Sequence, residues 1–123
     1  SGRLLADFGQ PRAGSRIKWN GVLVETRQGS EIRAIYHGRV AYADWLPGMG
    51  LLVILDHGDG YMSLYGHNDT LYISAGDWVA PGEVLATAGD SGGRAEPALY
   101  FEIRKGKRSE NPHRWFAKAL SGR

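Results

Sequence analysis

The sequence predicts an all-β domain, with antiparallel sheets arranged as a two-sheet sandwich or open barrel and a short helical turn near the C-terminus. Two observations lead to this prediction. The 123 residues include 18 glycines and 5 prolines spread along the chain, which is typical of many short strands joined by tight turns. Short apolar or alternating segments recur between these turn signals, and only one segment resembles a helix. The length suits a single domain with one core.

The expected strands follow one another at short spacing. Residues 38–44 alternate, whereas residues 51–55 form a continuous apolar run, as expected of a strand buried on both faces. Turn signals such as Pro47-Gly48 separate the segments. A helix is expected at 114–120, because Asn111-Pro112 fits a helix start. The full set of expected strands is 21–25, 31–35, 38–44, 51–55, 61–65, 70–73, 83–88 and 98–104.

Residues 1–15 are expected to be an N-terminal linker segment and residues 16–123 the folded domain. Ser1-Gly2 is typical of what remains after removal of a tag, so we expect the chain to be a piece of a longer protein. The sequence has no run of 18 apolar residues, and we expect no membrane span within it. It has no cysteine, which excludes disulfides and thiol catalysis and leaves the redox compartment open.

Charge is unevenly distributed although the net charge is only +2. Residues 100–123 carry seven Lys or Arg against two Glu, whereas residues 1–99 carry eight against eleven acidic residues. A basic end of this kind suits nucleic acid or an anionic surface, but no nucleic-acid motif accompanies it. We interpret it as a solvated basic edge and expect no nucleic-acid partner.

Six motifs stand in a fixed order between about residues 16 and 104. Two of them are Tyr65-Gly66-His67 and the segment Pro97-Ala98-Leu99-Tyr100-Phe101-Glu102. The others are residues 19–24, 31–40, 50–60 and 76–86. Together they resemble the LytM/lysostaphin-type zinc metallopeptidases, a resemblance that implies a barrel-sandwich hybrid domain.

In active members of that family, zinc is held by a His and an Asp of the first motif and by the second His of a His-x-His motif. The other His of that motif, and the His of Tyr-x-His, act on the water and the transition state. Strand side chains alternate between faces, so such ligands on neighbouring strands can converge on one tetrahedral metal that keeps a position for water.

Carried over to this chain, the three ligand positions hold Trp19, Leu23 and Tyr100, and the first catalytic His is replaced by Ala98. Only His67 is retained. Indole and isobutyl groups offer no lone pair, and a neutral phenol is a poor ligand. The resemblance therefore implies a degenerate member without catalytic residues, metal or cofactor.

His67 is either a functional remnant or a structural residue of the groove wall, and a lone His is more often structural. The same question applies to His37, His57 and His113. Neither His37 nor His57 has a His or Asp partner at i+2 or i+4 that also matches the family pattern. A relocated metal site around His67 is the alternative interpretation.

Alternation predicts which side chains face the former active-site groove. On the last motif strand, Ala98, Tyr100, Glu102 and Arg104 share the groove face, and Leu99, Phe101 and Ile103 point to the core. Ser63, Tyr65 and His67 are expected on the groove face and Met62 and Leu64 inside, while Trp19, Gly21 and Leu23 fall together.

The groove should thus be apolar and aromatic, with a cation at its edge and residues 44–50 as a rim loop. Tyr and Arg are enriched at interface hot spots, and Met adapts to a partner. The predicted partner-binding residues are Leu23, Met49, Tyr65, Tyr100 and Arg104. The alternatives are that Leu23 only fills the space of a lost metal, that Tyr100 only forms an internal hydrogen bond, and that Trp45 and Leu46 pack under the rim loop.

Within the family, residues 44–50, 62–66 and 99–104 resemble the EnvC group. That resemblance implies a periplasmic protein of a Gram-negative bacterium that activates N-acetylmuramoyl-L-alanine amidases during septal peptidoglycan splitting in cell division. It also implies an upstream coiled coil, outside this chain, that is engaged by a division-site ABC-transporter-like membrane complex. Two alternatives are a passive peptidoglycan-binding module and a residual metalloendopeptidase with an altered site.

Overall fold

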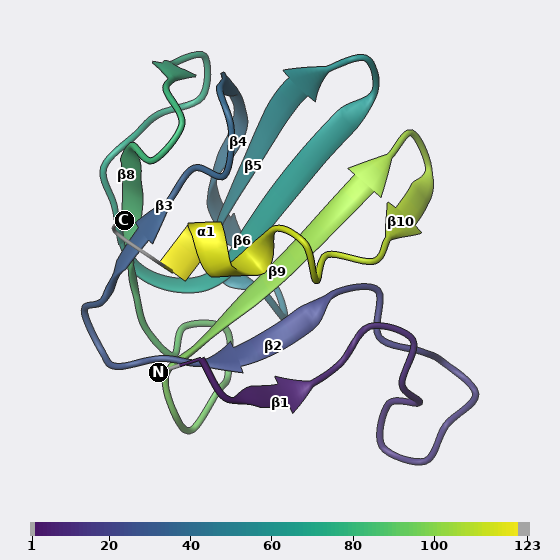
Figure 1. Cartoon of the computed structure of the whole chain (residues 1–123). Helices are drawn as coiled ribbons and strands as arrows, with labels where there is room; N and C mark the ends of the chain where they lie inside the picture. The colour runs from purple at the N-terminus through teal and green to yellow at the C-terminus, as the bar shows by residue number, and fades with distance from the viewer. Residues whose placement is uncertain (1, 121–123) are drawn as a thin grey trace.

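The computed structural model describes residues 2–120, and strands account for nearly all of the regular structure in this range (Figure 1). The all-β antiparallel class and the short C-terminal helix are confirmed. No helix in the range is both long enough and apolar enough to cross a membrane. The elements are β1 (Leu4–Ala6), β2 (Val22–Glu25), β3 (Glu31–Arg33), β4 (Gly38–Leu46), β5 (Gly50–Gly58), β6 (Tyr61–Leu71), β7 (Trp78–Val79), β8 (Val84–Ala88), β9 (Ala98–Lys105), β10 (Arg108–Glu110) and α1 (Phe116–Leu120).

The described strands join into one hydrogen-bonded network. The main path runs β1-β2-β9-β6-β5-β4-β7, with β10 paired to β9 and the β3–β8 pair attached through β6. The first part of β6 lies between β5 and β9, whereas its end, from Asn68 onward, pairs with β8. Figure 1 shows β3 and β8 standing apart from the layer that β2, β9, β6 and β5 form. The long strand β6 therefore links the main layer to the β3–β8 pair.

The core lies between the main layer and the β3–β8 pair. Leu99, Phe101 and Ile103 of β9 are buried in it, as their alternation predicted. Ile32 of β3 and Leu85 of β8 belong to the same buried cluster, and α1 adds its one buried residue near the end of the chain. Full burial of each large apolar side chain contributes about 1.5–3 kcal/mol to folding.

Several elements differ from the sequence prediction. The expected strands 61–65 and 70–73 are a single strand, β6, and β4 continues to Leu46, so that only three residues separate it from β5. Residues 4–6, within the predicted linker segment, form β1 and pair with β2. The short strands β7 and β10 were not predicted either. Strands of two or three residues carry too little alternation to be recognised, because the neighbouring strand's hydrogen bonds define them.

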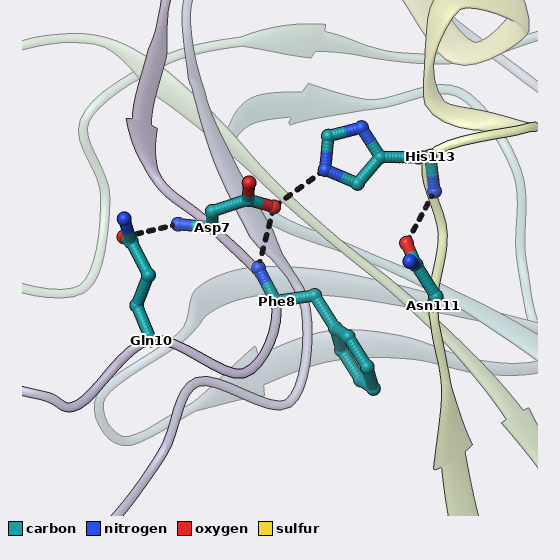
Figure 2. Close-up of polar contacts among 5 residues, drawn as sticks. All are labelled: Asp7, Phe8, Gln10, Asn111 and His113. Atoms are coloured by element: carbon teal, nitrogen blue, oxygen red, sulfur yellow. Dashed lines mark hydrogen bonds and ion pairs between the residues drawn. The ribbon is translucent and has the colours of Figure 1, made fainter.

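The segments that follow β1 and precede α1 are held together although they lie far apart in sequence (Figure 2). Nε2 of His113 lies 2.5 Å from Oδ1 of Asp7, which also accepts a hydrogen bond from the backbone N–H of Phe8. The hydrogen bond with His113 is the main reason that the pKa of Asp7 lies below its ordinary value. The Phe8 ring packs against the core. The Asp7–His113 contact therefore holds the segment after β1 and the segment before α1 together at the core.

A chain of hydrogen bonds connects the half-buried His57 to Ser63 and to the core residue Tyr65, both of β6. Nδ1 of His57 lies 2.7 Å from the carbonyl oxygen of His37, which can only accept, so Nδ1 carries the hydrogen. Nε2 therefore accepts from the Ser63 hydroxyl at 2.6 Å. Ser63 Oγ lies 2.8 Å from the Tyr65 hydroxyl, whose oxygen accepts from the backbone N–H of Ile35. This arrangement satisfies every group only while the His57 ring is neutral.

We expect the stability of the domain to fall as the pH decreases below neutrality. Burial is the main reason that the pKa of His57 lies below its ordinary value. The unfolded chain takes up the proton at about pH 6.5 and the folded chain only at lower pH, so acid favours unfolding between those two values. The melting temperature should drop between about pH 7.5 and pH 5.5, and it should drop less in His57→Gln.

The matched control is His37→Gln, because the His37 side chain is exposed and its charge is a smaller cause of the lowered His57 pKa than burial. This variant should keep most of the pH dependence of the unsubstituted domain. An identical pH dependence in His57→Gln would show that His57 does not cause the effect.

Candidate functional site

A second, smaller apolar cluster lies on the face of β2 and β9 opposite the core. Leu23 and Tyr100 are paired in register across the two strands, and both are 6% exposed. Ala98 is buried beside them, and Trp19 and Met49 pack against the group from outside the two strands. The structure therefore brings together the four altered motif positions, Trp19, Leu23, Ala98 and Tyr100, as the sequence predicted. We call the surface formed by Trp19, Leu23, Met49, Ala98, Tyr100 and Arg104 the groove face.

Tyr100 is the centre of the groove face. Its ring centroid lies 6.2 Å from that of Trp19, and the guanidinium of Arg12 lies 3.9 Å from the centroid of the Trp19 ring. The Tyr100 hydroxyl donates a 2.6 Å hydrogen bond to Oε1 of Glu102. Burial, and then the Glu102 carboxylate, raise the pKa of Tyr100 well above its ordinary value. The phenol therefore remains a neutral donor.

Two glycines allow the aromatic ring to lie against the strands. A Cβ on Gly21 would lie 2.4 Å from the carbonyl oxygen of Phe101 and 2.9 Å from the Tyr100 hydroxyl. A Cβ on Gly66 would lie 3.1 Å from Cε of Met49 and 3.4 Å from Cβ of Tyr100. These contacts place both glycines on the groove face, and any larger side chain would displace Tyr100 or Met49.

The prediction that Tyr65 faces the groove is wrong. Tyr65 is fully buried in the main core, paired in register with Phe101, and their ring centroids lie 5.4 Å apart. Paired residues of neighbouring strands share a face, and Gly66 pairs with Tyr100, so Gly66 takes the groove position. Ser63 is likewise buried on the core side, whereas Met62 and Leu64 pair with Arg104 and Glu102 on the groove side.

His67 explains why the alternation failed. Its φ is +67°, in the left-handed region that residues with a Cβ rarely adopt, and the β5–β6 register shifts nearby. Counting back by two from His67 therefore gave the wrong face for Tyr65. The backbone N–H of His67 donates to the carbonyl of Met49, and Nδ1 lies 2.7 Å from the carbonyl oxygen of Ser91. His67 thus ties the β4–β5 turn to the loop around Ser91, which favours the structural interpretation.

The residues at the family's zinc positions do not fit a zinc ion. Trp19 and Leu23 carry no donor atom that could bind the metal, and the Tyr100 hydroxyl already donates to Glu102. Nδ1 of His67 is engaged with Ser91, and burial is the main reason that the pKa of His67 lies below its ordinary value. Among residues 2–120, no group of three or more His, Cys, Asp or Glu is placed to hold a metal ion.

The rim of the groove face is the β4–β5 hairpin, and its tip is exposed. Trp45 is 52% and Leu46 41% exposed at the end of β4, so the alternative in which they pack under a loop is wrong. Met49, in the turn of this hairpin, is half-buried and packs against the cluster that contains Tyr100. Arg104, also half-buried, forms an ion pair with Glu102. Met49, in the β4–β5 turn, and Arg104, on β9, therefore border the apolar centre from two different segments.

Sequence reasoning missed two groups that belong to this site. Ala6 of β1 is buried against the cluster, although it lies in the segment predicted to be a linker. Glu102 was placed on the correct face but was given no role, and it is a buried carboxylate. The Tyr-x-Glu-x-Arg spacing of residues 100–104 was the available signal, because side chains two apart on a strand are neighbours on one face.

A separate pocket of about 390 Å³ lies where β5, β6 and β10 approach the segment before α1. Its lining includes Tyr36, His57, Tyr61, Glu110 and Trp115. None of the predicted site residues lines it. The groove face and this pocket are therefore distinct surfaces.

Solved structures define the class to which this fold and site belong. The catalytic domain of the prophage-encoded M23 protein EnpA from Enterococcus faecalis matches with a TM-score of 0.79 and 27% identity, over 89% of this chain and 88% of that one. A zinc-containing peptidase from Vibrio cholerae matches with a TM-score of 0.81 and 25% identity, over 89% and 35%. The catalytic domain of lysostaphin from Staphylococcus simulans shares the fold, with a TM-score of 0.82, 22% identity and coverage of 92% and 90%. The domain is thus of the LytM type.

The chain belongs to peptidase family M23, whose family model matches residues 17–112. It is 42% identical over 117 residues to the murein hydrolase activator EnvC of Escherichia coli (strain K12), covering 95% of this chain and 28% of that protein. It is 37% identical over 115 residues to the murein hydrolase activator NlpD of the same strain, covering 93% and 29%. The chain therefore spans less than a third of the length of these two relatives.

Proposed function

We propose that this domain is a non-enzymatic activator of a periplasmic N-acetylmuramoyl-L-alanine amidase, and that it binds the amidase through the groove face. The observation that carries the proposal is the apolar cluster of Leu23, Ala98 and Tyr100 with Trp19. By the resemblance, these residues stand at the family's three zinc-ligand positions and, for Ala98, at that of a catalytic His. The names of the relatives, which are murein hydrolase activators, support the same class of function.

The proposed mechanism is capture of an apolar helix. In the amidase, this helix would block the enzyme's own zinc site until the activator binds it. Helix-in-groove recognition needs an apolar cleft with a polar margin, which Leu23, Met49 and Tyr100 would supply together with Arg104. The activator shifts the amidase toward its open state because it binds only the conformation in which the helix is released. Tyr65 takes no part, since its side chain is buried in the core.

The wider setting of the activity is part of the same proposal. We infer that the domain acts in the periplasm of a Gram-negative bacterium, during septal peptidoglycan splitting in cell division. A coiled coil outside this chain would connect it to a division-site ABC-transporter-like membrane complex.

The test is release of soluble products from purified sacculi by the domain alone, by a cognate amidase alone, and by both together. Zinc and a chelator are added to separate samples of the domain alone. We expect rapid product release only from the mixture, because residues 2–120 hold no group of three or more candidate metal ligands and the amidase alone would be blocked.

Two other outcomes would reject the proposal. Cleavage by the domain alone, stopped by the chelator, would identify a metalloendopeptidase with an altered site around His67. Sedimentation of the domain with sacculi, without any effect on the amidase rate, would identify a passive peptidoglycan-binding module.

A further inference from the structure

Glu102 is the only carboxylate residue that is buried among residues 2–120, with 5% of its surface exposed. It lies in the middle of β9, on the groove face and between Tyr100 and Arg104. A buried carboxylate is costly unless its oxygens are paired and hydrogen-bonded. Both oxygens of the Glu102 carboxylate are therefore expected to have hydrogen-bond partners.

Each oxygen has one partner, and both partners belong to the groove face. Oε1 accepts the hydrogen bond from the Tyr100 hydroxyl, and Oε2 accepts a short hydrogen bond from Nε–H of Arg104. The second carboxylate near this face, Glu25, pairs instead with Arg3 near the start of the chain. Glu102 thus connects the buried Tyr100 to the more exposed Arg104.

The bonds to Glu102 determine what the two side chains offer to a partner. The Tyr100 hydroxyl donates its hydrogen to Glu102 in a buried bond, and only 6% of Tyr100 is exposed, so it acts on the partner mainly by fixing Glu102. Arg104 uses Nε, and its two terminal NH₂ groups stay free to donate; the side chain is 36% exposed. A planar guanidinium fixed at Nε has its remaining donors set in direction as well.

We propose that Glu102 is a positioning residue: bonded to the buried Tyr100 hydroxyl, it holds the Arg104 guanidinium in the orientation that the partner recognises, without touching the partner itself. This inference rests on the proposed function and deepens it. The partner segment would then present an oxygen acceptor, a carboxylate or a backbone carbonyl, to the Arg104 terminal nitrogens, next to apolar side chains that lie on Leu23 and Tyr100.

The experiment compares Glu102→Gln with the unsubstituted domain in the sacculus assay, as a function of domain concentration. Glutamine has the same shape and still accepts from Tyr100, but it removes the charge that fixes Arg104. We expect the concentration for half-maximal stimulation to rise about tenfold, the loss that corresponds to one charge-assisted hydrogen bond. Maximal stimulation and melting temperature should stay close to those of the unsubstituted domain, since only binding is weakened.

A spectroscopic signature separates positioning from a merely structural role. In the unsubstituted domain, the Nε–H of Arg104 should give a protected proton signal in NMR, because it is hydrogen-bonded to a carboxylate. This signal should be lost in Glu102→Gln while the backbone spectrum keeps its dispersion. Leu64→Ala is the control, because Leu64 pairs with Glu102 in register but touches neither of the two bonds.

A half-maximal concentration unchanged in Glu102→Gln would overturn the positioning role and leave the proposed function standing. Failure of the unsubstituted domain to stimulate any amidase would overturn both. If Glu102→Gln lowers the melting temperature substantially, Arg104→Lys serves as the second variant: it keeps the charge but lacks the planar fork. Equal half-maximal concentrations for Arg104→Lys and the unsubstituted domain would equally overturn the inference.

Discussion

Replacing Tyr100 or Arg104 by alanine is expected to abolish stimulation of the amidase at concentrations that saturate the unsubstituted domain. Tyr100 provides the aromatic centre of the groove face and Arg104 its cation, and these two residue types dominate binding energies at interfaces. Loss of one such residue costs about 2–4 kcal/mol of binding free energy, or a thirtyfold to thousandfold loss of affinity. The measurement is the rate of product release from sacculi at fixed amidase and increasing domain concentration.

Both variants should remain folded. The main core lies on the opposite face of β9 and keeps Leu99, Phe101 and Ile103. We expect Arg104→Ala to lose about 1–3 kcal/mol in the free energy of unfolding, since one hydrogen-bond partner of the buried Glu102 is removed. Tyr100→Ala should lose about 3–5 kcal/mol, because it also removes a buried aromatic ring. A loss of this size leaves a typical domain folded at ambient temperature.

The matched control for Arg104→Ala is Arg108→Ala. Arg108 lies on β10 and also pairs with a glutamate, Glu110, but its side chain is 82% exposed and outside the groove face. The Arg108→Ala variant should stimulate the amidase as strongly as the unsubstituted domain. Normal stimulation by both Tyr100→Ala and Arg104→Ala would show that the amidase does not bind at the groove face.

Gly50→Ala is expected to be strongly destabilising. Gly50 has a φ of +68°, and a Cβ at this position would lie 2.2 Å from Oγ and 2.4 Å from the carbonyl carbon of Ser91, and 2.7 Å from the backbone nitrogen of Gly92. The backbones of two loops meet here, so relief requires movement of one loop rather than of a side chain. We expect a loss of about 3 kcal/mol or more in the free energy of unfolding, from overpacking and backbone strain together. Denaturant unfolding of the purified variant measures it.

Gly48→Ala separates the steric effect from the strain of a positive φ. Gly48 has a φ of +83°, two residues earlier in the same hairpin, and a Cβ there would meet nothing within 4 Å. Its substitution should cost only about 1–2 kcal/mol. Equal losses in the free energy of unfolding for Gly50→Ala and Gly48→Ala would show that the close approach of the two loops does not cause the destabilisation. Gly50→Ala should also weaken stimulation of the amidase, because the adjacent residue in the sequence, Met49, belongs to the groove face.

The sequence by itself determined the fold class and the chemical character of the groove face. Strong local alternation in residues 98–104 assigned both faces of β9 correctly, with Phe101 in the core and Tyr100 opposite. The resemblance placed Trp19, Leu23 and Ala98 around Tyr100, and the structure brings them together. These predictions succeeded because they depend on regular extended backbone, in which the face of each residue follows from its position alone.

Only the tertiary structure decided the face of Tyr65, the pairing of β1 and the engagement of Glu102. A single left-handed residue, His67, interrupts the alternation on β6, and its conformation is held by contacts with Met49 and Ser91 from distant segments. The three residues of β1 acquire their structure from β2. Glu102 is buried, and Tyr100 and Arg104 both donate hydrogen bonds to it. Each of these features depends on register and contacts between segments, and such non-local interactions leave no periodic signal in the sequence.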